Sequence, residues 1–254
     1  VSDLNDLQVV QTYIAGHLDP ENGSYLLAME KADSSAMENS VHLKDFSIEK
    51  LALPLTSNRA RAIEVIQNEV LTNEAIIDVS RDEAGHFVYD ANEDITKIAV
   101  VERHKLTGNV FVGLLKNYGI KQGAIAISIA HDSHNLVVTG TNDTDMAIAI
   151  EALQDQDGGV VLVHDGEIVA SMPLQVAGLM STASGEEVTA QLENINKVAH
   201  DVLGISADVD PVMTLSFMPL SVIPSLKITD LGLVNVNEGA FVDVSVQQLE
   251  QDPR

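Results

Sequence analysis

The stretch AIAISIAHDSHN, residues 124–135, decides the fold. Its first seven residues, 124–130, alternate isoleucine with alanine or serine, which predicts a strand buried on both faces. Small residues on one face indicate a neighbour that approaches closely, such as a helix. Five polar residues, 131–135, follow directly. Residues at the end of a rigid strand are held in place while remaining reachable, so this loop is the first candidate for a functional site.

Downstream of that loop, strands and helices alternate. Residues 136–139 predict a strand, and 141–144 supply N-cap candidates for a helix that runs through Leu153 to a stop at Gly158-Gly159. Residues 160–170, with Asp165-Gly166 at the centre, predict a hairpin with a type I′ turn.

A second helix is predicted from Ser184, where Ser184-Gly185-Glu186-Glu187 fits a capping box, and Gly204 ends it. The last fifty residues, punctuated by three prolines, predict short strands and turns.

Upstream, residues 98–101 predict a short strand. Residues 107–118 carry valine, phenylalanine and leucine at helical spacing before Gly119, which predicts a helix. The pattern from 50 to 77 is strand-like, and the polar, acidic residues 81–94 predict an exposed loop or hairpin tip.

The first 49 residues differ from the rest. Residues 7–27 predict a hairpin with a long loop at Pro20-Glu21-Asn22-Gly23, and residues 31–39 form a polar arm. We therefore expect a small N-terminal β unit, 1–49, and a larger α/β domain, 50–254. The fold class is α+β, mainly β with a few helices, and the strand–helix units are too few for an eight-fold barrel.

Composition excludes several classes of function. The chain has 14 basic and 38 acidic residues, a formal charge of −24, which disfavours binding to nucleic acid or to an anionic membrane. It has no cysteine, which removes disulfides, thiol nucleophiles and cysteine-ligated zinc. No apolar run approaches the ~20 residues of a membrane-spanning helix. The chain begins at Val1 without methionine, so we consider a fragment of a longer protein.

The polar loop contains His131, Asp132, Ser133, His134 and Asn135. These side chains suit proton transfer or ligand binding, but a hairpin loop with Asx turns at Asp132 and Asn135 explains the pattern equally well. Metal binding by the two histidines is a weaker interpretation, because no third ligand is visible. A hydrolase triad is weaker still, since Ser133 lies on no G-x-S-x-G elbow.

A second polar group, Glu102-Arg103-His104, follows the strand at 98–101. It is expected at the same sheet edge as the first loop. A structural salt bridge of Arg103 with a surface carboxylate is the alternative interpretation.

Several segments, in this order and spacing, resemble the C-terminal part of bacterial and archaeal adenine deaminases. The most specific are 98–104, 107–109 and 123–135, and the others are 158–159 with Val163, 173–181, 213–217, 223–224 and 229–234. The resemblance covers most of residues 50 to 240. Residues 9–27 are similar to the strands that complete a small β-sandwich after an amidohydrolase barrel.

This resemblance implies hydrolytic removal of ammonia from adenine, giving hypoxanthine, in purine salvage. In that family a barrel holds two divalent metal ions, manganese or iron, which activate the attacking water. The barrel, with its H-x-H pair, is absent from these residues. We therefore expect the C-terminal portion of an adenine deaminase that binds no metal itself and is inactive alone. The absence of cysteine separately excludes the cysteine-ligated zinc site of other deaminases.

The implied catalytic residues are His131, Asp132 and His134. The implied substrate-binding residues are Ser133, Asn135, Glu102, Arg103 and His104. The expected partners are adenine or another purine and the barrel domain, with no nucleic acid and no membrane, in a cytoplasmic homo-oligomer.

Three hypotheses remain open from the sequence. The domain closes over the barrel mouth and completes its site, or it is a structural or oligomerisation module with an internal histidine network. In the third, it is a free-standing binding protein for purines or another small molecule.

Overall fold

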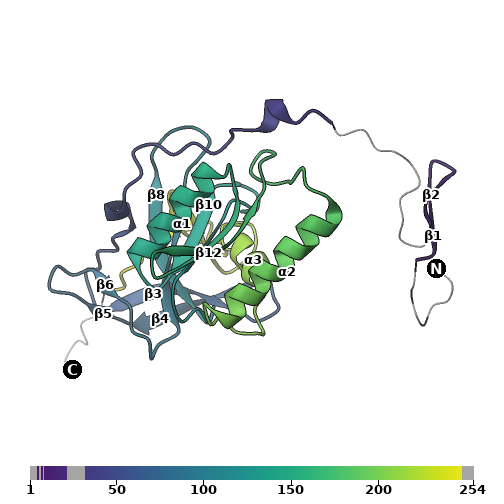
Figure 1. Ribbon diagram of the computed structural model, residues 1–254. Coiled ribbons are helices and arrows are strands. Elements are labelled where there is room, and N and C mark those ends of the chain that lie inside the picture. Colours follow the sequence, from purple (N-terminus) through teal and green to yellow (C-terminus); the bar gives the residue numbers. More distant parts are fainter. Residues whose placement is uncertain (1–4, 6, 8, 22–31, 248–254) are drawn as a thin grey trace, which may run out of the picture. The chain divides into compact units, whose positions relative to one another are not determined.

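The computed structural model describes residues 5, 7, 9–21 and 32–247 (Figure 1). The chain divides into two units, residues 1–36 and residues 37–254. The predicted division into 1–49 and 50–254, with a barrel-associated sandwich in the first part, stays a prediction.

The first unit contains an antiparallel hairpin of β1 (Gln11–Ile14) and β2 (His17–Glu21). Its turn is Ala15-Gly16, where both residues have positive φ, 48° and 84°. The predicted turn at Pro20 is wrong, because Pro20 lies within β2; residues 22–27 of that prediction lie outside the described residues. The Ala-Gly pair was overlooked because proline and asparagine are stronger turn signals.

An eight-stranded sheet organises the second unit, in the order β12-β11-β9-β10-β7-β8-β3-β4 (Figure 1). All neighbours are antiparallel except β3 and β8, which run parallel. The strands are β3 (Arg59–Val65), β4 (Thr72–Asp78), β7 (Ile95–Val101), β8 (Val110–Lys116), β9 (Ala124–Ile127), β10 (Leu136–Gly140), β11 (Gly159–His164) and β12 (Glu167–Pro173).

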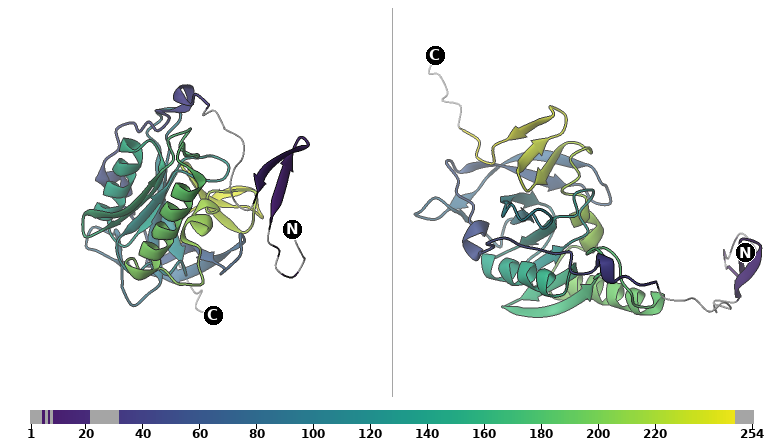
Figure 2. Two further views of the ribbon diagram at one scale, coloured as in Figure 1. Left: turned by 45° about the vertical axis from the view of Figure 1, so that its right-hand side comes forward. Right: turned by 90° about the horizontal axis from the view of Figure 1, so that it is seen from above.

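Each face of this sheet has its own hydrophobic core. Ile125 and Ile127 of β9 belong to the core that includes Ile195 of α2 (Gly185–Asp201). Ala124 and Ala126 belong to the opposite core, which includes residues of α1 (Asp143–Asp155). Figure 2 (left) shows the two helices on opposite sides of the sheet. The prediction that the alanine face meets a helix is confirmed.

The remaining elements are short, and those of the second unit contribute to both cores. They are α3 (Pro211–Ser216), a small sheet of β13 (Leu226–Thr229), β14 (Gly232–Asn235) and β15 (Ala240–Val242), a hairpin of β5 (Ser80–Arg81) and β6 (Phe87–Val88), and the 3-10 turns η1 (Ser35–Met37) and η2 (Ile48–Leu51). Ile228 and Leu233 join the isoleucine-side core.

The chain returns to the large sheet near its C-terminus. The Arg61 amide donates to Val244 O at 2.7 Å, and the Val246 amide donates to Arg59 O at 2.9 Å. Residues 244–246 thus pair with the first half of β3, while β8 pairs with its second half.

Local signals placed both long helices. Asn142 caps α1 by accepting from the Asp145 amide, and Ser184 and Glu187 form the predicted capping box of α2. The Asp165-Gly166 turn joins β11 to β12 with positive φ at both residues, as a type I′ turn requires. The exposed hairpin tip predicted within 81–94 is also confirmed.

Two predictions from periodicity are wrong. Residues 107–118 form no helix, because 110–116 are strand β8. A strand buried on both faces is apolar without strict alternation, and such a run also satisfies helical spacing. The short helix α3 was missed within the predicted strands and turns, although Asp210 caps it and Pro211 occupies its first turn.

The mainly β, α+β fold class is confirmed. Of the helices in the described ranges, none combines the length and apolar character needed to cross a membrane.

Candidate functional site

Both polar groups lie at the same end of the large sheet, in the loops that follow its interior strands β9 and β7. Residues 131–135 are the second part of the connection from β9 to β10, and residues 102–109, the frame loop, connect β7 to β8. Because Leu136 of β10 pairs with Val101 of β7, the end of the first loop lies beside the start of the second. We call residues 131–135 the histidine loop.

Arg103 is buried, 1% exposed, and joins three segments. Its Nε donates to His134 O, its Nη1 to the carbonyl and hydroxyl of Ser40, both at 3.1 Å, and its Nη2 to Ala177 O at 2.9 Å. Burial lowers the pKa of Arg103, and the nearby Asp157 carboxylate opposes that shift. The guanidinium stays charged and serves as a cross-link between backbone segments.

A glycine makes room for this cross-link. A Cβ on Gly178 would lie 2.9 Å from Arg103 Nη1, and its φ of +71° is a conformation that other residues rarely adopt. Residues 177–181 therefore contribute to the Arg103 site in two ways. The Ala177 carbonyl accepts a hydrogen bond from Arg103, and Gly178 packs closely against the guanidinium.

Glu102 is buried and organises the frame loop. Its carboxylate accepts from the amides of His104, Lys105 and Thr107 and from the Thr107 hydroxyl, at 2.5 to 3.0 Å. Burial by itself would raise the pKa of Glu102, but these four hydrogen bonds outweigh it and lower the pKa to about 2. The carboxylate is therefore ionised at neutral pH with its acceptor sites directed at its own loop.

The three histidines lie close enough for their charges to interact. His131 stacks on Phe217 with ring centroids 4.7 Å apart, and its amide donates to Ser216 O. His104 Nε2 lies 2.9 Å from Ser133 O. Burial and the charges of Arg103, His131 and His104 lower the pKa of His134, while Asp132 partly opposes them. His134 is thus kept neutral near pH 7, with one nitrogen that donates and one that accepts.

Behind the stacked pair lies a buried lysine. Lys227 Nζ donates to Phe217 O at 3.1 Å and to Val70 O at 2.9 Å. Burial lowers the pKa of Lys227 to about 8. This side chain fixes the backbone of Phe217, on which the His131 ring rests.

Asp132 and Ser133 are exposed and border a cavity of about 480 Å³. Asp230, in the turn between β13 and β14, borders the same cavity. Its two carboxylate oxygens accept from Asn109 Nδ2 at 3.1 Å and from Asn135 Nδ2 at 3.3 Å. The carboxylate therefore joins the frame loop and the histidine loop at the cavity wall.

Asn135 is 5% exposed, and its Oδ1 has no hydrogen-bond partner within the described part of the chain. Its other amide atom is fixed by Asp230, so the orientation of the side chain is set.

The structure thus brings all eight predicted residues to the same end of the large sheet but gives them different surroundings. His131, Asp132, Ser133, His134 and His104 are exposed or half-buried, whereas Glu102, Arg103 and Asn135 are buried. Their predicted roles stay predictions. Asp230, Asn109 and Phe217 were assigned no role from the sequence, although 229–234, 107–109 and 213–217 were part of the family resemblance.

Chemically, the site offers two carboxylates and a hydroxyl that line the cavity, from Asp132, Asp230 and Ser133, and the imidazole of His134 in the same loop. Such groups suit hydrogen bonding to a heterocycle and short proton transfers. Among residues 5, 7, 9–21 and 32–247, no group of three or more histidine, aspartate or glutamate side chains is arranged to hold a metal ion. The donor set therefore does not fit the two-ion centre implied by the resemblance.

Comparison with known proteins gives a consistent result. Residues 69–240 match the family model described as adenine deaminase C-terminal domain. The chain is 48% identical over 244 residues to adenine deaminase 2 of Desulfotalea psychrophila, covering 96% of this chain and 42% of that protein. It is 51% identical over 239 residues to adenine deaminase of Ligilactobacillus salivarius, covering 94% of this chain and 41% of that protein. The chain thus spans about two fifths of the length of these relatives.

Proposed function

Since the chain belongs to the family of adenine deaminase C-terminal domains, we propose that it completes the active site of an adenine deaminase whose metal-bearing barrel lies outside these residues. The reaction is hydrolysis of adenine to hypoxanthine and ammonia. The observation that carries this proposal is the convergence of His131, Asp132 and His134 in one loop, of which Asp132 lines the 480 Å³ cavity and the two histidines lie next to that lining in the sequence.

In this proposal His131, Asp132 and His134 contact the purine. A neutral imidazole can donate to a ring nitrogen or accept from an N–H group, and it can carry a proton to the departing ammonia. The Asp132 carboxylate accepts from N–H donors of the base. Ser133 adds a hydroxyl on the same cavity wall.

Asn135, Glu102, Arg103 and His104 then act mainly by positioning. Arg103 fixes the backbone carbonyl of His134, and His104 lies against the carbonyl of Ser133. Glu102 holds the loop that carries both. Because the donors of Arg103 and the oxygens of Glu102 are occupied by protein groups, we assign their effect on substrate to the loops they hold.

The proposal assigns the two divalent ions, manganese or iron, to the barrel, where they would activate the attacking water. No step in the present chain passes through them. We further propose that the enzyme is a cytoplasmic homo-oligomer of purine salvage.

The test uses the full-length protein that carries this domain. His131→Ala and His134→Ala should each lower the turnover of adenine by about 100-fold or more, the usual range for loss of a proton-transferring group. The matched control is His86→Ala, a half-exposed histidine on the β5–β6 hairpin, which should keep the wild-type rate. Wild-type turnover in both loop variants would sink the proposal.

A structural module is the second candidate function. It is favoured by the buried, largely satisfied contacts of Arg103 and Glu102, which need no ligand to explain them. Under this alternative both histidine variants turn over adenine normally and only variants of the frame loop lose stability.

A further inference from the structure

Three exposed apolar side chains surround the histidine loop. Val222, Leu231 and Phe241 are 74%, 66% and 61% exposed, which makes them the most exposed large hydrophobic residues within 37–247. All three border the 480 Å³ cavity that Asp132 and Ser133 also line. We call these three residues the collar.

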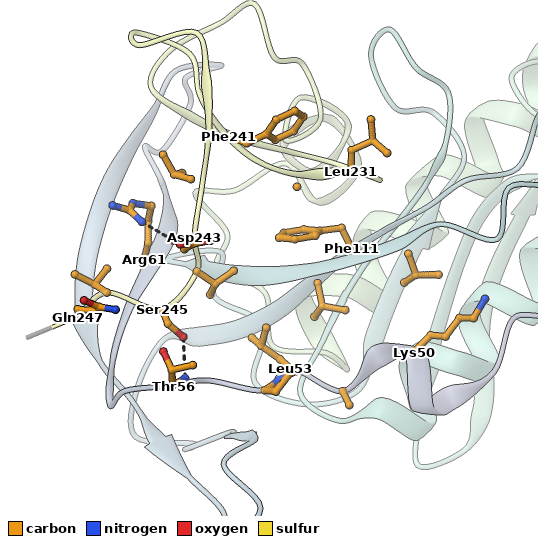
Figure 3. A pocket seen from close by; sticks show the side chains of 18 residues that line it. Lys50, Leu53, Thr56, Arg61, Phe111, Leu231, Phe241, Asp243, Ser245 and Gln247 are labelled. Carbon is orange, nitrogen blue, oxygen red and sulfur yellow. Dashed lines mark hydrogen bonds between the residues drawn. The ribbon is translucent and has the colours of Figure 1, made fainter.

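The collar is built from separate segments. Val222 follows α3, Leu231 lies in the β13–β14 turn, and Phe241 is on β15. Leu231 and Phe241 also border a second cavity, of about 970 Å³, whose opposite side includes Leu53 and Thr56 (Figure 3). In Figure 3 both side chains lie across from Phe111 of β8, so apolar side chains continue into the second cavity, whose lining also includes the charged residues Lys50, Arg61 and Asp243.

The surface chemistry of the collar is unlike that of the rest of the chain. The formal charge is −24, yet among the described residues that border the first cavity the only ionisable ones are Asp132 and Asp230. Isolated exposed apolar residues are ordinary, whereas a cluster that is poor in charge is typical of an interaction surface.

The partner that fits this surface is the barrel of the same deaminase, an inference that rests on the proposed function. The relatives are more than twice as long as the matched region, so most of such a protein lies outside this domain. Because the collar and the histidine loop share one cavity, a body that covers the collar also meets the loop. A second copy of this chain is the competing occupant, and a concentration-dependent dimer would identify it.

We propose that the collar docks on the metal-bearing barrel and seals the rim of the shared active site. Packing of these apolar side chains against the barrel would exclude water around the histidine loop.

The absence of cysteine from this chain permits a direct test. Phe241→Cys places a single thiol in the collar, and Ile168→Cys places one at a 52% exposed strand position away from both cavities as the control. Maleimide labelling of each thiol is followed by mass spectrometry of its peptide, in the 254-residue chain and in the full-length protein. Labelling at 241 should be at least about tenfold slower in the full-length protein, because interface cores exclude solvent and reagents. Labelling at 168 should be unchanged.

A second variant measures the effect on activity. Val222→Lys should lower turnover in the full-length protein about tenfold, since a charge in an apolar interface costs more than 1 kcal/mol. Ile168→Lys should keep the wild-type turnover, and neither change should move the unfolding midpoint of the 254-residue chain.

Equal labelling rates at 241 in both proteins would overturn the inference. So would slowing in the isolated chain that grows with protein concentration and accompanies a dimer in light scattering, because the occupant would then be a second copy. The two proposals fail separately. An unprotected collar together with inactive histidine variants removes only the docking surface, and a protected collar with active histidine variants removes only the catalytic role.

Discussion

The frame loop and the histidine loop lie at the same end of the large sheet, but their side chains differ in how many hydrogen bonds they make. In the frame loop, the Glu102 carboxylate accepts four hydrogen bonds and the Arg103 guanidinium donates to three segments. In the histidine loop, the imidazoles of His131 and His134 and the Asp132 carboxylate have no hydrogen-bond partner among the described residues.

The difference means that one loop provides rigidity, while the other presents side chains that are available to a ligand. The charged groups of the frame loop form hydrogen bonds with backbone amides and carbonyls, and one of those carbonyls belongs to His134. The histidine loop can therefore keep its own side chains uncommitted without losing its geometry. A site that must present proton donors and acceptors to a ligand requires this arrangement.

The largest expected effect comes from Glu102→Gln, which should remove hydrogen bonds that hold the frame loop. Glutamine offers one carbonyl oxygen and turns an amino group toward amides that are themselves donors. We expect a loss of about 2 to 4 kcal/mol in the free energy of unfolding at pH 7, measured by urea denaturation.

The same variant has a signature in acid. Because the pKa of Glu102 is lowered from 4.5 to about 2, its contribution is present above pH 4.5 and is lost as the pH falls toward 2. The stability difference between wild type and variant should therefore narrow over that range. Glu83→Gln, at the exposed β5–β6 tip, is the control and should leave stability unchanged. A constant difference across the range would contradict the hydrogen-bonded carboxylate.

Arg103→Lys is expected to have a smaller effect, about 1 to 3 kcal/mol, since lysine keeps the charge but not the planar fork that reaches three segments. Thermal and urea unfolding of the chain measure it. Arg59→Lys, at an exposed strand position, provides the comparison and should be neutral. Equal stability of the two variants would mean that the Arg103 cross-link is not what holds the histidine loop.

Asp132→Asn is expected to have the smallest effect on stability, because the histidine loop is not held by this side chain. As Asp132 is exposed, we expect a change in unfolding free energy of less than about 0.5 kcal/mol. The Asp132 charge raises the pKa of His134 against the larger effect of burial, so its removal should lower that pKa further. Proton NMR of the imidazole during a pH titration measures the shift, and an upward shift would contradict this placement of Asp132.

Local patterns were sufficient where one short segment determines the outcome. The capping box at Ser184, the Asp165-Gly166 turn and the isoleucine–alanine alternation of β9 were each predicted correctly. Strand β8 was not, because its burial depends on β7 and β3, which the local pattern does not contain. For residues 110–116, pairing with the two neighbouring strands determined the structure, although the spacing of the apolar residues predicted a helix.

The site shows the same division. The histidine loop was found because its polar residues adjoin an obvious strand. Asp230 was given no role, since its bond to Asn135 joins residues 95 positions apart. Nor could the sequence show that Arg103 is buried among carbonyls rather than paired with a surface carboxylate.

The pairing of residues 244–246 with β3 bears on how the chain is made. The first half of β3 lacks this neighbour until nearly two hundred further residues have been synthesised, and contacts of such long sequence separation form slowly. The first half of β3 therefore keeps an open edge until residues 244–246 are available to pair with it. A chain that lacks residues 244–246 would keep this half of the β3 edge unpaired, and unpaired strand edges can pair with other chains.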